Sequence, residues 1–330
     1  MSKKDTMSLD EFLAEWHSDS PTLLVHTSGS TGRPKPMYVE KRRMEASARI
    51  TCRFLGLHGG DTALLCMPLD YIAGKMMVVR ALTCGLRLLS VPPVGLPCWE
   101  GAVDFAAMVP LQVWNLLHDP QGRERLRLIR HLIIGGGAID DALAAELRDF
   151  PHAVWSTYGM TETLSHVALR RLNGPDRSDW YTPFEGVTVS LSADGCLVID
   201  APAVHDGPLT TNDRAQLDGQ RFRILGRKDN VICSGGVKIQ IEEVERQLQP
   251  HVCVPFMITK APDAKFGEQV VLLTESEDVD ALRHVCRDVL PKFWQPRAYV
   301  TIDRLPLTET GKPARREAER MAYSAMTRKE

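Results

Sequence analysis

The chain has 330 residues, of which 44% are apolar and 25% charged, the balance of a folded protein rather than of a disordered or fibrous one. At roughly 150 residues per domain, this length predicts two domains. The 40 Lys and Arg residues nearly balance the 42 Asp and Glu residues, leaving a formal net charge of −2. A chain without a basic footprint is not built for nucleic acid, so we exclude binding driven by phosphate backbones.

No segment predicts a membrane span or export. The longest stretch without a charged residue, 105–118, is shorter than the roughly 20 apolar residues that cross a bilayer, and the N-terminus lacks the apolar centre of a signal peptide. Eight cysteines lie far apart without a C-x-x-C pair, which argues against a zinc site and a disulfide framework. We therefore expect a cytoplasmic protein.

The first half of the chain alternates between helix and strand patterns. Ser8 and Glu11 have the spacing of a capping box ahead of a helix that would bury Phe12. A short apolar strand over 22–25 follows, then a polar glycine-rich loop and a helix from about 41 to 55. Further strand-like and helix-like segments, among them a single segment over 105–117, continue to residue 157. This alternation predicts an α/β sheet covered by helices.

From Gly186 the pattern changes to short strands with tight turns, at 187–191, 196–199, 215–217 and 221–225, which predict consecutive hairpins. Beyond 230 we expect helices near 241–248 and 279–290 and strands near 253–258 and 270–273, the elements of a small α+β domain. The sequence thus predicts a large nucleotide- and acid-binding domain over 1–228 and a small C-terminal lid domain over 229–330.

The loop Thr27-Ser-Gly-Ser-Thr-Gly-Arg-Pro-Lys35 has the composition of a phosphate site. Glycines let the backbone approach an anion, hydroxyls donate hydrogen bonds, and Lys35 supplies charge. It is not the loop of ordinary P-loop NTPases, because only two residues separate Gly29 from Gly32 and no Ser or Thr follows Lys35. A solvated Ser/Thr/Gly turn explains the same composition.

A second candidate is Trp155-Ser-Thr-Tyr-Gly-Met-Thr-Glu162, at the end of a predicted strand, where open α/β sheets bind ligands. A tyrosine can stack on a purine, a threonine hydroxyl can meet a phosphate oxygen, and a carboxylate can hold Mg²⁺. Taken singly, each motif has an ordinary explanation. This one is more often a turn, Thr211-Asn-Asp213 could bind ribose hydroxyls or merely end a strand, and the stretch 226–232 could be an ordinary interdomain turn.

Five motifs follow one another between residues 27 and 313: T-S-G-S-T-G-R-P-K, Y-G-M-T-E-T, T-N-D, G-R-K-D-N-V-I-x-S-G-G-V-K-I and L-P-L-T-E-T-G-K-P. Taken together and in this order, they resemble the motifs of the adenylate-forming superfamily of acyl-CoA synthetases, peptide-synthetase adenylation domains and luciferases. The short chain and the segment 66–77 are most similar to o-succinylbenzoate-CoA ligases of menaquinone synthesis. The resemblance implies the adenylate-forming α/β fold with a mobile C-terminal lid and without most of the usual first subdomain. Where that subdomain is missing, we expect a homodimer contact or a resurfaced sheet edge.

The resemblance also implies roles for individual residues. Lys312, Thr161 and Glu162 would be catalytic, Glu162 would hold Mg²⁺, and Asp229 would be the hinge. The acid pocket would include Tyr71, Lys75, Gly135 and Met160, and coenzyme A would meet Ser234, Gly235, Gly236 and Lys238. ATP would be bound by Thr27, Ser28, Gly29, Ser30, Thr31, Gly32, Lys35, Gly136, Gly137, Ala138, Tyr158, Gly159, Asp213 and Arg227.

The implied reaction explains these residue types. A carboxylate attacks the α-phosphorus of ATP, so Mg²⁺ and Lys312 must offset the repulsion between two anions. Coenzyme A then displaces AMP from the acyl adenylate, and the lid domain turns between the two steps. The expected function is an AMP-forming ligase of o-succinylbenzoate and coenzyme A. A ligase for another acid or for a carrier protein, and a non-catalytic nucleotide-binding relative, remain alternatives.

Three features need separate interpretation. Many relatives have an aromatic–His pair where this chain has Asp70-Tyr71, so a role of that histidine is not expected here. Lys75 would either hold the second carboxylate of succinylbenzoate or only extend its ammonium from an amphipathic helix to water. The arginines of the C-terminal tail are expected to form a solvated helix face, and their position next to Lys312 leaves contact with a coenzyme A phosphate as the alternative; they are Arg315, Arg316 and Arg320.

Overall fold

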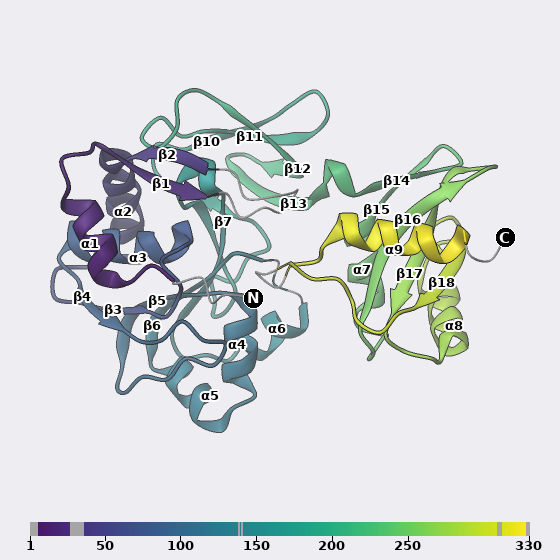
Figure 1. Ribbon diagram of the computed structural model, residues 1–330, viewed down its shortest axis with the longest axis horizontal. Coiled ribbons are helices and arrows are strands. Elements are labelled where there is room, and N and C mark those ends of the chain that lie inside the picture. The colour runs from purple at the N-terminus through teal and green to yellow at the C-terminus, as the bar shows by residue number, and fades with distance from the viewer. Residues whose placement is uncertain (1–5, 27–35, 138, 140, 309–311, 328–330) are drawn as a thin grey trace. The chain divides into compact units, whose positions relative to one another are not determined.

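The computed structural model describes residues 6–26, 36–137, 139, 141–308 and 312–327. Contacts within the chain divide it into two compact units (Figure 1). The first comprises residues 1–190, 198–209 and 217–223, and the second comprises residues 191–197, 210–216 and 224–330. The second unit thus also takes in two short segments from the hairpin region. The domain boundary expected between 228 and 229 stays a prediction.

A seven-stranded sheet forms the centre of the first unit. The strand order is β4 (Arg87–Ser90), β3 (Thr62–Leu65), β5 (Val103–Met108), β6 (Ile129–Ile134), β7 (Ala153–Gly159), β8 (His166–Arg171) and β9 (Thr182–Pro183). The first five strands in this order pair in parallel, and β8 and β9 are added antiparallel. Because the carboxyl ends of parallel strands meet at one edge, the loops after β3, β5, β6 and β7 gather there.

Helices cover both faces of this sheet (Figure 1). On one face α4 (Pro110–Leu117), α5 (Pro120–Arg127) and α6 (Asp141–Glu146) enclose a core with strand residues such as Ala106, Leu132 and Val154. Neighbouring strand residues point the other way, and there the ring of Phe105 lies under the Arg80 guanidinium of α3 (Ile72–Cys84). The predicted α/β sheet covered by helices is confirmed.

The N-terminal elements follow their sequence signals closely. Helix α1 (Leu9–His17) begins with the predicted capping box, in which the Glu11 amide donates to Ser8 Oγ and the Ser8 amide to the Glu11 carboxylate. Strands β1 (Thr22–His26) and β2 (Pro36–Glu40) pair antiparallel. Helix α2 (Lys41–Leu55) has the predicted bounds and ends where Gly56 adopts φ +62°, a conformation that favours glycine.

The predicted run of hairpins is also present. Strands β10 (Thr188–Leu191), β11 (Cys196–Asp200), β12 (Leu209–Asp218) and β13 (Arg221–Arg227) form a sheet in this order. Consecutive strands lie side by side, and glycines with positive φ, Gly195 and Gly219, stand in two of the turns. The chain continues through the 3-10 turn η2 (Lys228–Asn230).

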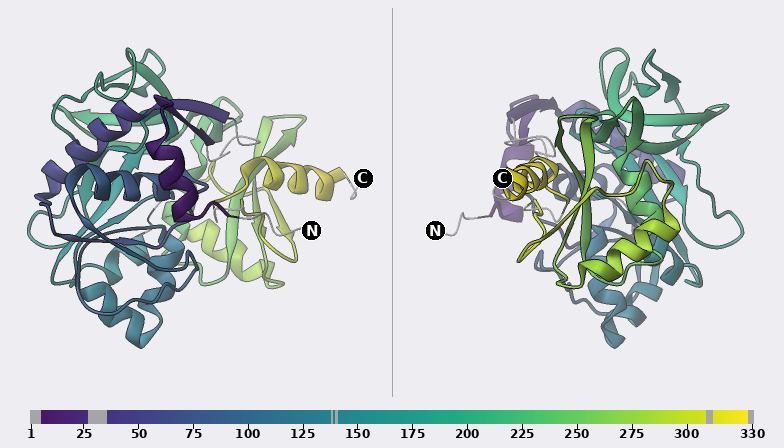
Figure 2. Two further views of the ribbon diagram at one scale, coloured as in Figure 1. Left: turned by 60° about the vertical axis from the view of Figure 1, so that its left-hand side comes forward. Right: turned by 90° about the vertical axis from the view of Figure 1, so that its right-hand side faces the viewer.

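The second unit is a small α+β structure. Its sheet has the order β15 (Val237–Gln240), β14 (Val231–Ser234), β17 (Gly267–Thr274) and β16 (Phe256–Asp263), and β18 (Ala298–Thr301) pairs with β17. Ile258 and Leu272 pack with α7 (Ile241–Leu248) and α8 (Val279–Val289), whereas their neighbours Met257 and Leu273 pack with α9 (Arg315–Thr327). This alternation of period two places helices on both faces of the sheet (Figure 2).

Two expectations need correction. The segment over 105–117 is not one element, because β5 ends at Met108 and α4 begins at Pro110, whose fixed φ suits the first turn of a helix. Arg315 is not solvated: its guanidinium donates to both carboxylate oxygens of Glu245, each at 2.6 Å, and to the Ile258 carbonyl at 3.1 Å. The exposed Arg316 and Arg320 do face solvent.

All eight cysteines are free thiols. Within the described part of the chain, every helix is too short or too polar to cross a bilayer.

Candidate active site

The turn after β7 carries the candidate residues Thr161 and Glu162. These residues lie in the 3-10 turn η1 (Thr161–Thr163) at the carboxyl edge of the sheet. Thr161 is 6% exposed, and Glu162 is partly exposed. Thr163 Oγ1 accepts from the Met160 amide at 3.1 Å and donates to the Ser165 carbonyl at 2.8 Å. One side chain therefore closes both ends of the turn.

Gly159 shows how tightly this turn is packed. A Cβ at this position would lie 2.2 Å from the Ser165 carbonyl oxygen and 2.4 Å from the Cα of His166. Any larger residue would push β7 and β8 apart just where their pairing register shifts. The glycine of the Y-G-M-T-E motif is thus required by the fold, whether or not it also meets ATP.

Tyr158 belongs to an aromatic cluster. Its ring centre lies 5.0 Å from that of Phe222 and 5.8 Å from that of Tyr181, and the Tyr181 hydroxyl hydrogen-bonds to Ser156 Oγ at 2.7 Å. Tyr158 is 9% exposed, so packing on adenine stays a prediction for it. Sequence reasoning missed Tyr181 and Phe222, because aromatic residues in or next to short strands are equally typical of a hydrophobic core.

The glycine turn after β6 lies against two strands. The Gly135 amide donates to the Met108 carbonyl of β5 at 3.0 Å, and a Cβ on Gly135 would lie 2.2 Å from Thr157 Oγ1 of β7. Gly136 has φ +78°. This turn brings backbone close to the carboxyl edge, as a loop that lines a ligand must.

Ala138 and residues 27–35 of the phosphate-loop candidate lie outside the described residues, so their predicted roles stay predictions.

Lys75 extends away from solvent and toward the N-terminal elements. Its side chain is 3% exposed, and Nζ donates to the Leu24 carbonyl at 3.3 Å and lies 3.9 Å from a Glu15 carboxylate oxygen. Burial lowers the pKa of Lys75, and Glu15 and Asp70 oppose that shift. These contacts give Lys75 a structural partner on β1. Its predicted contact with substrate, and that of the adjacent Tyr71, stay predictions.

In the second unit the structure brings together Asp213, Arg227, Asp229 and Lys312, here called the Asp213 cluster. Arg227 donates to Asp213 Oδ1 and to Asp229 Oδ2, each at 3.1 Å. Burial lowers the pKa of Lys312, the charge of Arg227 lowers it further, and Asp213 opposes both. Residues from three distant motifs thus share one electrostatic neighbourhood.

Gln240 supports this cluster, and sequence reasoning missed it. Its side-chain amide donates to the Arg227 carbonyl at 2.8 Å. A Cβ on Gly226, which has φ +142°, would lie 2.5 Å from the same amide nitrogen. Gln240 therefore fixes the backbone at the end of β13. The signal in the sequence is its place two residues after Lys238, a residue that the resemblance relates only to coenzyme A.

The residues predicted to meet coenzyme A form a hairpin. β14 and β15 are joined by Gly235 and Gly236, with φ +58° and +84°, as a two-residue turn of this kind requires. The Gly235 amide donates to the Phe266 carbonyl at 2.9 Å, Ser234 is buried, and Lys238 is exposed. The turn presents a backbone that a ligand can approach, and its contact with coenzyme A stays a prediction.

Among the residues that the structure describes, no group of three or more His, Cys, Asp or Glu side chains could hold a metal ion. Mg²⁺ does not need such a group, because it is usually held by one or two carboxylates together with waters and substrate phosphates. Glu162, partly exposed on a rigid turn, fits that kind of site.

Comparison with known proteins decides the family. The model of the family described as AMP-binding enzyme matches residues 2–202, more than half of the chain. The chain belongs to the AMP-binding enzyme family. Its mixed α/β architecture is that of the adenylate-forming enzymes, as the sequence motifs predicted.

Individual relatives extend this likeness. The 2-succinylbenzoate--CoA ligase of Salmonella typhimurium is 29% identical over 313 residues, which are 88% of this chain and 67% of that protein. An acyl-CoA synthetase (AMP-forming)/AMP-acid ligase II-like protein from Dyadobacter fermentans is 33% identical with a TM-score of 0.64, covering 93% of this chain and 91% of that one. A variant of Escherichia coli MenE with bound OSB-AMS is 25% identical with a TM-score of 0.73, and the match covers 93% of this chain and 70% of that one. The chain spans about two thirds of the length of the curated relatives it matches.

Proposed function

We propose that this chain is an AMP-forming acid–CoA ligase and that its acid is 2-succinylbenzoate. The observation that supports the ligase class is the Asp213 cluster, in which the charges of Arg227 and Asp213 act on Lys312 and Arg227 donates to Asp213. A module that only bound nucleotide would have no need of this lysine. The choice of acid is supported by curated relatives named for that substrate, which match 88% of the chain.

In the first step the acid carboxylate attacks the α-phosphorus of ATP, and the bond to pyrophosphate breaks. No general base is required, because the nucleophile is already an anion. Lys312 stabilises the charge that builds on the α-phosphate, and the Thr161 hydroxyl donates to the same group. Glu162 would hold Mg²⁺ together with the substrate phosphates, and the ion would supply further positive charge. Asp213 accepts hydrogen bonds from the ribose hydroxyls while Arg227 keeps its carboxylate oriented.

In the second step the thiol of coenzyme A attacks the acyl carbonyl, and AMP leaves with the electron pair of the broken C–O bond. We assign Ser234, Gly235, Gly236 and Lys238 to this step and Asp229 to the hinge between the two steps. Asp229 accepts from both Arg227 and Asn212, so a change of hinge conformation would break contacts that belong to the Asp213 cluster.

A ligase for a monocarboxylic acid is the second candidate. It is favoured by the position of Lys75, whose side chain is 3% exposed and whose ammonium faces the Leu24 carbonyl and the Glu15 carboxylate. A carrier protein in place of free coenzyme A and a non-catalytic relative are further alternatives. A homodimer belongs to the same proposal. So does a cytoplasmic location, which the eight free thiols support.

Product analysis separates these functions. The protein is incubated with ATP, Mg²⁺, coenzyme A and one acid from a panel of 2-succinylbenzoate, benzoate and medium-chain fatty acids, and thioesters and AMP are measured by mass spectrometry. We expect succinylbenzoyl-CoA and equimolar AMP with the first acid. Thioester formed from benzoate but not from 2-succinylbenzoate would refute the substrate. Absence of AMP with every acid would refute the ligase.

A further inference from the structure

A chain of hydrogen bonds links the turn after β7 to helices α2 and α3. It begins at the guanidinium of Arg80, which is 1% exposed and donates to Ser165 Oγ at 2.7 Å. Ser165 Oγ lies 3.1 Å from His166 Nδ1, and His166 Nε2 lies 3.1 Å from Thr51 Oγ1. Thr51 Oγ1 is 3.1 Å from the Ser47 carbonyl. Four side chains and one backbone group thus form a continuous path.

With a neutral imidazole, the bonds of this chain have one consistent set of directions. The Ser47 carbonyl only accepts, so the Thr51 hydroxyl gives its proton to that carbonyl and Thr51 Oγ1 accepts from His166 Nε2–H. His166 Nδ1 then carries no proton and accepts from the Ser165 hydroxyl, whose oxygen accepts from Arg80. This assignment is the neutral Nε2–H tautomer of His166.

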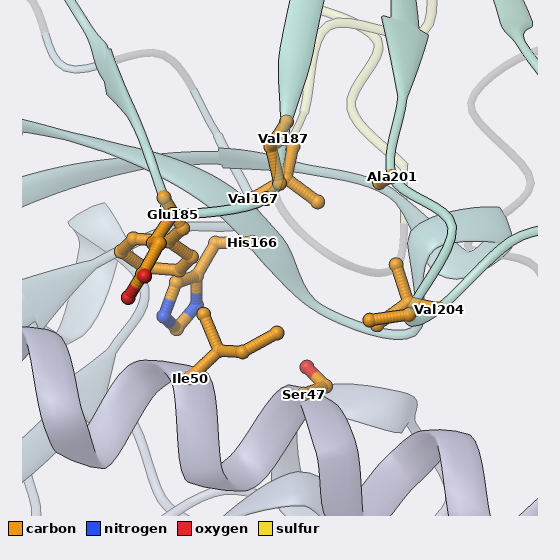
Figure 3. Close-up of a pocket in the computed structure, with 11 residues that line it drawn as sticks. Ser47, Ile50, His166, Val167, Glu185, Val187, Ala201 and Val204 are labelled. Atoms are coloured by element: carbon orange, nitrogen blue, oxygen red, sulfur yellow. The ribbon is translucent and has the colours of Figure 1, made fainter.

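The surroundings of His166 favour that neutral form. Burial lowers the pKa of His166 well below its usual value, and the Arg80 charge lowers it further. The imidazole extends toward α2 beside Ile50 (Figure 3), and its edge meets the Phe184 ring at a centre distance of 5.4 Å. Glu185, at the rim of the same small pocket, pairs with Arg53 of α2.

The turn requires this support because its backbone is strained. Leu164, which directly follows η1, has φ +64° although it is not a glycine, and its side chain is 2% exposed. Such a conformation persists only where neighbours determine it. The next residue, Ser165, is held through its side chain by Arg80 and His166 and through its amide by the Thr163 carbonyl at 2.7 Å.

We infer that His166 is a positioning residue. Through Ser165 it holds Leu164 in its strained conformation and thereby fixes the directions of Thr161 and Glu162 at the carboxyl end of β7. The inference rests on the proposed function, in which these two side chains meet the α-phosphate and Mg²⁺. His166 itself touches no substrate in this scheme, and its contribution is the geometry of the turn.

The kinetic test compares His166→Phe and His166→Gln in the full chain by acid-dependent ATP–pyrophosphate exchange. Phenylalanine keeps a ring but makes no hydrogen bond, so we expect kcat to fall ~10- to 100-fold, the cost of a small misplacement of reacting groups, with the KM values for ATP and acid nearly unchanged. Glutamine retains a donor for Thr51 Oγ1 and should recover most of the loss. Wild-type kcat in His166→Phe would overturn the inference.

Val113→Ala is the matched control. Val113 is fully buried on α4, in the core on the opposite face of the sheet, so this variant loses stability without touching the hydrogen-bond chain. We expect a lower melting temperature and an unchanged kcat. A kcat that falls as far as in His166→Phe would assign the effect to general loss of stability and overturn the positioning role.

A measurement that needs no substrate separates this inference from the proposed function. The amides of Leu164 and Ser165 bond within the turn, to Thr161 and Thr163, and should exchange with solvent at least ~10-fold faster in His166→Phe than in wild type. Unchanged exchange would overturn the positioning role. If wild type shows no acid-dependent activity, the proposed function fails and amide exchange alone decides the inference.

If His166→Phe does not fold, Thr51→Val takes its place. This variant removes the acceptor at the other end of the imidazole, and both kcat and amide exchange are measured on it.

Discussion

The turn after β7 and the Asp213 cluster hold candidate residues by different physical means. Around the turn, hydroxyls, a neutral imidazole and a buried guanidinium bond to one another, and His166 is only 7% exposed. The cluster relies on ion pairs whose side chains are more accessible, with exposed fractions of 33% for Arg227 and 49% for Asp229. Salt screens accessible pairs and hardly affects buried neutral bonds. The first region therefore supplies fixed geometry and the second supplies charge that can rearrange.

The largest effect should come from removing charge from the cluster. Lys312→Ala should lower the rate of adenylation by ~100- to 1,000-fold, the usual cost of losing a group that stabilises transition-state charge. Pyrophosphate release measured without coenzyme A reports this step alone. Lys292→Ala, which removes an exposed lysine of the same unit, is the control and should leave the rate unchanged. Equal rates for Lys312→Ala and wild type would remove Lys312 from the mechanism.

The second unit also contains an ion pair that is less accessible to solvent than those of the Asp213 cluster. Arg315 and Glu245 bond through two pairs of atoms, with side chains 20% and 21% exposed. Arg315→Met should lower the free energy of unfolding by about 3 kcal/mol, because it leaves the Glu245 carboxylate without a charged partner, with the Ile258 amide still donating to it at 2.9 Å. Arg320→Met on the same helix breaks the exposed pair with Glu317 and should cost under about 0.5 kcal/mol. Urea unfolding measures both, and equal losses would contradict the distinction between buried and exposed pairs.

Acid should weaken the first unit through its histidines. Burial, then Arg130 and Arg171, lowers the pKa of His131 from 6.5 to about 4, and that of His166 is lowered as well. Below pH 6.5 the unfolded chain therefore binds protons that the folded unit does not, so stability falls as pH falls from about 6.5 to about 4. For His131 the loss at pH 5 is on the order of 1 kcal/mol.

Urea unfolding at pH 7 and pH 5 tests this dependence. His131→Gln should reduce the difference in stability between the two pH values, whereas His152→Gln, at an exposed histidine, should not. A difference that is the same in wild type and His131→Gln would show that other groups cause the acid sensitivity.

The smallest effect is expected at Lys75. Lys75→Met removes the hydrogen bond to the Leu24 carbonyl and should cost about 1 kcal/mol of stability, seen as a lower melting temperature. The KM for 2-succinylbenzoate should stay within about twofold of wild type, since the Lys75 side chain is only 3% exposed and its ammonium faces Leu24 and Glu15. A KM raised about tenfold, one charged hydrogen bond, would instead place Lys75 in the acid pocket.

The sequence predicted well those features that have a local cause. The capping box of α1, the bounds of α2 and α7 and the order of the hairpins follow from caps, periodicity and turn residues that act over a few positions. The likeness to adenylate-forming enzymes gave the fold and the candidate residues. It could not give partners set by tertiary packing: Arg315 with Glu245, Lys75 with Leu24, or the path from Arg80 through His166 to Thr51. Those pairs are separated by 51 to 115 residues, and no local pattern connects them.

Direct detection of the acyl adenylate tests the central claim. The protein is mixed with ATP, Mg²⁺ and 2-succinylbenzoate in the absence of coenzyme A, quenched in acid within seconds and analysed by mass spectrometry. The proposed mechanism predicts succinylbenzoyl-AMP and pyrophosphate in equal amounts, close to one per protein chain. Release of ADP and an acyl phosphate, or thioester formation without any acyl-AMP at early times, would contradict it.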